Sequence, residues 1–131
     1  MAMAKIVSDA KDMVQQMRPE RVKGRFVFRA IAAEEIAQRL PEIRGLFAEH
    51  EGVSAILPAE DGDTDAMAQI TLQVHSALDG VGLTAAVSGE LAKAGIPCNM
   101  VAALHHDHVF VPEAQAGAAL SILKDLSGRE E

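Results

Sequence analysis

The sequence predicts an α+β fold in which helices pack on one face of a mainly antiparallel sheet. Short apolar runs of strand type alternate along the chain with segments whose apolar residues recur every three or four positions. The length of 131 residues and the apolar share of 49% suit one domain with a buried core. We therefore expect a single compact unit over residues 1–131.

The first half of the chain contains two predicted helices and two predicted strands. Residues 10–17 place their apolar side chains on one face of a helix, which Pro19 ends. Residues 25–31 are rich in β-branched and aromatic side chains and predict a strand, with a short helix over residues 33–40 after it. Residues 53–57 form another short apolar run bounded by turn residues, which predicts a second strand.

The second half is more regular. Residues 70–75 alternate apolar and polar side chains, as in a strand with one buried face. A helix with apolar residues at i, i+4 and i+8 follows and stops at Gly95. Residues 98–104 form an almost wholly apolar strand, which we expect to be central and covered by helices on at least one face. After a turn come a strand over residues 109–111 and a last helix, so residues 70–126 have the order β-α-β-β-α.

This order is that of a ferredoxin-like sheet with one strand missing, because the complete motif has a fourth strand after the last helix. Residues 127–131 are polar and charged and do not supply it. We expect residues 25–31 or residues 53–57 to complete the sheet. Residues 1–66 would then be an N-terminal lobe that supplies strands, and residues 67–131 the C-terminal domain.

Composition excludes several partners. The net charge is −7, the basic residues are scattered, and Trp and Tyr are absent, so nucleic acid is not an expected partner. No segment approaches the roughly 18 uninterrupted apolar residues of a membrane helix, so no membrane partner is expected. Cys98 is the one cysteine, in an apolar stretch, and we interpret it as a small buried hydrophobe. The lack of an internal disulfide and of a secretory signal pattern favours a cytoplasmic location.

Residues 73–112, which contain HSALDGVGLTA and CNMVAALHHDHVFVP, resemble the most specific region of a family of small bacterial ACT-domain proteins, formerly a domain of unknown function. Residues 17–20, residues 24–28 and residues 51–53 also resemble that family. The resemblance implies ACT-like lobes, frequent homodimers, and a regulatory, non-catalytic protein that binds an amino acid or a related small molecule. The sequence departs from the family at Leu104 and His105, where aromatic residues are more usual.

In the ACT arrangement, ligands bind near the loop between the first strand and the first helix. Here Gly80 and Gly82 let the backbone approach a ligand, and the free N–H groups of a helix start attract a carboxylate. The alternative is that the glycines only permit a tight turn, with Asp79 or Thr84 as the helix cap. Asn99 is interpreted as a buried amide that needs partners, from a ligand or from backbone. The predicted ligand-binding residues are His75, Ser76, Asp79, Gly82, Leu83, Thr84 and Asn99.

The histidine run from His105 to His108 supports the alternative function, a metal-binding protein or metal-dependent enzyme. In an extended chain His105 and Asp107 lie on one side and His106 and His108 on the other, so the four do not converge locally. We therefore expect no metal and no cofactor. The sequence also lacks the common nucleophile, phosphate-loop and zinc-hydrolase motifs, which favours a protein that is not an enzyme.

Overall fold

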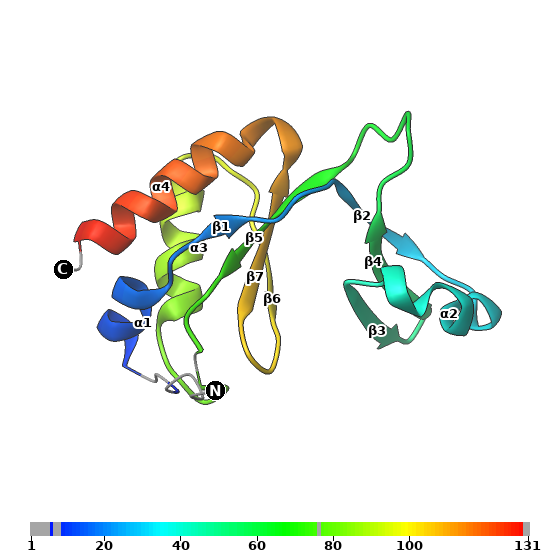
Figure 1. Cartoon of the computed structure of the whole chain (residues 1–131), viewed down its shortest axis with the longest axis horizontal. Helices are drawn as coiled ribbons and strands as arrows, with labels where there is room; N and C mark the ends of the chain where they lie inside the picture. The colour runs from blue at the N-terminus through cyan, green and yellow to red at the C-terminus, as the bar shows by residue number, and fades with distance from the viewer. Residues whose placement is uncertain (1–5, 7–8, 76, 130–131) are drawn as a thin grey trace. The chain divides into compact units, whose positions relative to one another are not determined.

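The chain divides into two compact units in a computed structural model that describes Ile6, residues 9–75 and residues 77–129 (Figure 1). The first unit joins the residues up to Lys23 to those from Ala68 onward, and the second is Gly24–Met67. The sequence predicts one unit with lobes that meet between residues 66 and 67. The structure differs by having a second boundary after Lys23, because the N-terminal helix buries its apolar face in the core of the C-terminal half.

The first unit contains the predicted β-α-β-β-α order together with one helix and one strand from the N-terminus. Its elements are α1 (Ala10–Gln16), β1 (Glu20–Arg21), β5 (Met67–Leu72), α3 (Leu83–Lys93), β6 (Asn99–Ala102), β7 (Asp107–Pro112), the 3-10 helix η2 (Glu113–Gln115) and α4 (Ala116–Arg129). The strands lie in the order β1-β5-β7-β6, with β1 antiparallel to β5 and β6 antiparallel to β7.

Helices α1, α3 and α4 all lie on one side of this sheet (Figure 1). Alternation along β5 turns Ala68, Ile70 and Leu72 toward them, and these side chains have no exposed surface. The other buried residues of the same cluster are Met13, Val14, Met17, Val74, Leu83, Val87, Leu91, Ile96, Val109, Val111, Ala116, Ala119, Leu123 and Leu126. The predicted fold class, a ferredoxin-like α+β sheet with helices on one face, is confirmed.

In the described part of the chain, no helix is long and apolar enough to cross a lipid bilayer.

The fourth strand of this sheet comes mainly from β1. Glu20 pairs with Thr71 and Arg21 with Ile70, in antiparallel register. Of the two predicted segments, residues 25–31 contribute a single pair to β5, between Phe26 and Met67, and residues 53–57 pair with no C-terminal strand. The backbone of Gly24 has a φ of +114°, which ends the extended run after β1.

Strand β6 lies at the edge of the sheet, so the prediction that it is central is wrong, whereas one of its faces is covered as expected. Met100 packs against the core, whereas Asn99 is exposed. A long apolar run is typical of a central strand, but in β6 it belongs to an edge strand with one partly covered face. Cys98, just before β6, is half-buried against the core, and burial raises the pKa of its thiol. This agrees with the interpretation of Cys98 as a hydrophobe.

The second unit is a smaller sheet with one helix. Its elements are β2 (Phe26–Ala30), α2 (Ala33–Arg39), the 3-10 helix η1 (Leu40–Glu42), β3 (Gly45–Glu49) and β4 (Gly52–Pro58). The strands lie in the order β3-β4-β2 and are antiparallel. Ile31, Ala55 and Leu57 form its buried cluster, against which Ile36 and Ile43 pack. The sequence predicts β2, α2 and β4 but not β3.

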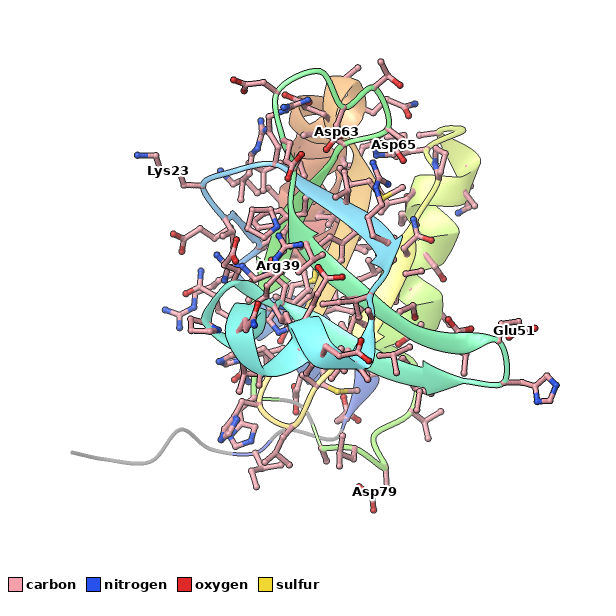
Figure 2. All side chains as sticks on the ribbon, turned by 90° about the vertical axis from the view of Figure 1, so that its right-hand side faces the viewer. Lys23, Arg39, Glu51, Asp63, Asp65 and Asp79 are labelled. Atoms are coloured by element: carbon pink, nitrogen blue, oxygen red, sulfur yellow. The ribbon has the colours of Figure 1, made fainter. Side chains whose placement is uncertain are left out.

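The acidic stretch before β5 is tied to β2 by an arginine. Arg29 donates to both carboxylate oxygens of Asp65, at 2.8 and 2.9 Å, and to Asp63 at 3.3 Å. Figure 2 shows Asp63 and Asp65 on the same loop. The hydrogen bond and charge of Arg29 lower the pKa of Asp65 below its ordinary value. Asp63 and Asp65 of the acidic loop therefore have a structural role, because they bind Arg29 within the second unit.

Candidate ligand-binding site

A pocket of about 480 Å³ lies beside the connection between β5 and α3 in the first unit. We call it the α3 pocket. Its wall comes from α1, from the connection itself, from the first turn of α3 and from the turn between β6 and β7. Most of the lining is apolar, and Thr84 and Asp107 supply its polar side chains. The volume falls in the range of small-molecule sites.

Two glycines give the α3 pocket its shape. The backbone of Gly82 has a φ of +111°, and a Cβ at this position would lie 2.7 Å from Cβ of Ala10. A Cβ at Gly80 would lie 3.1 Å from the carbonyl oxygen of Ala77 and 3.3 Å from Sδ of Met13. The connection therefore lies directly on α1, and a side chain at Gly82 meets both strain and a clash. Both predicted roles of the glycines, a tight turn and access to the backbone, are compatible with this geometry.

The N-terminus of α3 opens at the α3 pocket without a side-chain cap. Gly82 is the N-cap residue, and its carbonyl oxygen accepts the first helical bond from the N–H of Ala86 at 2.9 Å. The N–H groups of Leu83, Thr84 and Ala85 precede that bond and have no partner within the helix. All three residues line the pocket. The helix therefore presents donors and the positive end of its dipole to a ligand there. The alternative prediction, that Asp79 or Thr84 caps α3, is wrong because the cap position belongs to Gly82.

Asp107 brings a carboxylate to the same pocket. It is the first residue of β7, pairs with Ala102 of β6, and retains 6% of its surface exposed. A negative charge and the positive end of a helix thus line one small apolar space. A molecule with a carboxylate and an ammonium group on neighbouring atoms matches that arrangement.

Two ACT-domain family models match the chain, one over residues 7–72 and the other over residues 67–125. The chain belongs to the ACT-domain family. ACT domains are regulatory domains that bind small ligands and often form dimers. The boundary between the two matches falls at β5, which both models include. No curated protein matches the sequence.

Several solved structures share the fold. A Vibrio cholerae protein of unknown function, described as a possible transport protein, is 36% identical with a TM-score of 0.75, covering 87% of this chain and 92% of that chain. The Agrobacterium tumefaciens protein Atu0741 is 17% identical, with a TM-score of 0.63 and coverage of 83% and 87%. Aspartokinase alpha and beta subunits reach 14% identity and a TM-score of 0.61, with coverage of 84% and 97%. The last two show the fold alone.

The predicted site residues divide into two groups in this ACT fold. Gly82, Leu83 and Thr84 line the α3 pocket. His75, Asp79 and Asn99 are not among its lining residues, and Ser76 lies outside the described residues. Figure 2 shows Asp79 pointing outward from the connection. Asn99 is exposed, not buried as expected, and its amide donates to the carbonyl oxygen of Phe110 at 3.3 Å, which is the backbone alternative.

The histidines from His75 to His108 make two separate sets of contacts. The ring of His75 lies 5.4 Å from that of His105 and 6.3 Å from that of His106, measured between centroids. His108 instead places its Nδ1 3.0 Å from the hydroxyl of Thr71. Among the residues that the structure describes, no group of three or more His, Cys, Asp or Glu side chains is arranged to hold a metal ion.

Asp107 is the site residue that sequence reasoning missed. It stands inside the histidine run, and no prediction from the sequence gives it a role apart from those histidines. Its place at the start of β7, opposite Ala102, is set by strand register and not by local sequence. The signal available in the sequence was a carboxylate directly before an apolar strand.

Proposed function

We propose that the chain is a non-catalytic regulatory ACT protein that binds a small amino acid in the α3 pocket. The observation that supports this most strongly is the pairing of the uncapped start of α3 with the buried Asp107. The α-carboxylate of the ligand meets the N–H groups at the helix start, and its ammonium group meets the carboxylate of Asp107. Each charge of the ligand then has a partner in the pocket.

The rest of the wall favours a ligand with an aliphatic side chain. Met13, Val81, Leu83 and Ala102 are among the apolar residues that line the α3 pocket. A polar ligand side chain would lose its hydration there without a replacement partner. Valine, leucine and isoleucine are therefore the first candidates.

The pocket lining also supports the non-catalytic part of the proposal. Among the described residues that form it, Thr84 and Asp107 are the polar side chains, and the lining holds no histidine, lysine or cysteine beside them. Acid–base or nucleophilic catalysis needs a nucleophile paired with a base within hydrogen-bonding reach. A site made of one carboxylate, one hydroxyl and backbone N–H groups suits binding.

A homodimer in the cytoplasm is part of the same proposal. ACT domains often dimerise, and β3 is an edge strand of the second unit that exposes 72% of Phe47 and 44% of Leu46. An apolar edge strand of this kind is usually covered by a partner. A second copy of the chain would cover it symmetrically.

Thermal shift against the common amino acids tests the proposed function. A ligand present at about 100 times its dissociation constant adds about 2.7 kcal/mol of stability, which raises the melting temperature by several degrees. Valine, leucine or isoleucine should produce the largest shift, and the matching acid without its amino group a smaller one. A melting temperature that none of the amino acids raises would contradict the proposal.

A further inference from the structure

A second pocket, of about 490 Å³, lies along β1 and the end of β5 in the first unit. Because Ala68, Ile70 and Leu72 face the helices, Thr71 faces the other side of the sheet, whereas Gln73 follows the end of β5 and also lies near α4. The lining residues are Arg18, Glu20, Val22, Thr71, Gln73 and His106. None of them lines the α3 pocket, and all but Val22 are polar or charged. We call this space the sheet pocket.

Arg18 enters the sheet pocket from an unusual backbone conformation. Its φ is +38°, and it is the one residue other than glycine with a positive φ in the described part of the chain. It directly follows Met17, the C-cap of α1. Glycine is the usual residue at the position after a C-cap. An arginine in this conformation costs about 1 kcal/mol relative to glycine. The position therefore carries a side chain that the helix end does not require.

Gln73 holds that conformation in place. Its side-chain amide donates to the carbonyl oxygen of Arg18 and to Oε2 of Glu20, each at 2.9 Å, and its backbone N–H donates to Met17. One glutamine thus fixes the backbone that carries the guanidinium and orients the carboxylate beside it. Within the described residues, Arg18 takes part in none of the ion pairs.

His106 adds a hydrogen-bond acceptor to the sheet pocket. Its Nδ1 lies 3.3 Å from the carbonyl oxygen of Val74, which only accepts hydrogen bonds. The proton of the neutral ring is therefore on Nδ1, and Nε2 is an acceptor. With the carboxylate of Glu20, the sheet pocket offers acceptors for a donor group and a guanidinium for a carboxylate.

We propose that the sheet pocket is a second ligand site, for a small zwitterion with a polar side chain such as serine, asparagine or glutamine. The ligand's carboxylate pairs with Arg18 in the two-pronged manner that guanidinium groups favour, and its ammonium group pairs with Glu20. The polar wall suits a polar side chain, whereas the α3 pocket suits an aliphatic one. This proposal does not depend on ligand binding in the α3 pocket.

Calorimetric titration of the whole chain with serine, asparagine and glutamine tests this site. The wild type should show saturable binding of at least one of them. Arg18→Gly should weaken that binding at least about tenfold while the melting temperature stays the same or rises, because glycine relieves the backbone strain. Glu20→Gln should weaken it as well, without any change of backbone, which keeps the test valid if Arg18→Gly alters the fold.

Asp79→Asn is the matched control, because it removes a carboxylate that lines neither pocket and should leave this binding unchanged. Three results would overturn the assignment. They are the absence of saturable binding to the wild type, an affinity that both Arg18→Gly and Glu20→Gln leave unchanged, and an affinity that Asp79→Asn lowers as much as they do.

Discussion

Replacing Gly82 with alanine is expected to destabilise the protein by about 2 kcal/mol or more. Two effects add at this position. An alanine would have to adopt a φ of +111°, which L-residues rarely do, and its Cβ would lie 2.7 Å from Cβ of Ala10. That atom belongs to a short side chain at the start of α1, so the clash is relieved only if α1 or the connection moves. Chemical denaturation of wild type and variant measures the change in the free energy of unfolding.

Gly89→Ala provides the control, since it makes the same chemical change seven positions along. Gly89 lies inside α3, and a Cβ there meets no heavy atom within 4 Å. Alanine is a better helix former than glycine by roughly 0.8–1 kcal/mol, so this variant should be more stable than the wild type. Opposite signs for the two substitutions would establish that the conformation of Gly82, not the loss of glycine, matters. A Gly82→Ala protein as stable as the wild type would contradict the described geometry.

Replacing Asp107 with asparagine is expected to lower the affinity for an aliphatic amino acid about 10- to 100-fold. The variant keeps the shape of the side chain but removes the charge that faces the ligand's ammonium group. A hydrogen bond to a charged group contributes about 1.5–3 kcal/mol, and each 1.4 kcal/mol is tenfold in affinity. Titration calorimetry with the amino acid that stabilises the wild type best measures the loss.

The comparison with a ligand that lacks the amino group makes this test specific. Wild type should prefer the amino acid to its desamino analogue, and Asp107→Asn should lose most of that preference. Asp79→Asn removes a carboxylate from the same connection, where it points outward (Figure 2), and should change nothing. Equal losses in both variants would mean that general charge, and not Asp107, attracts the ligand.

Local periodicity predicted the central part of the fold. The alternation of Ile70 and Leu72 identified β5, and the spacing of Leu83, Val87 and Leu91 identified α3 with its buried face. These signals work because one face of each element must be apolar to pack against the same core. The start of α3 at the candidate site was predictable for the same reason.

Pairings between distant segments were not predictable in this way. β1 consists only of Glu20 and Arg21, and two charged residues show no strand pattern in the sequence. They are extended because they pair with β5. Asp107 enters the α3 pocket through the register of β7 with β6, and nothing in the neighbouring histidines indicates it. The exposure of Asn99 follows from the edge position of β6, which the apolar run of that strand does not reveal.

Mapping of ligand binding by amide chemical shifts tests the central claim most directly. Uniformly ¹⁵N-labelled protein would be titrated with valine, leucine and isoleucine, and each backbone amide signal followed. The account predicts saturable shifts that are largest at Leu83, Thr84 and Ala85, which line the α3 pocket and whose N–H groups are proposed to bind the ligand carboxylate. A folded protein in which these three amides do not respond to any of the three amino acids would contradict it.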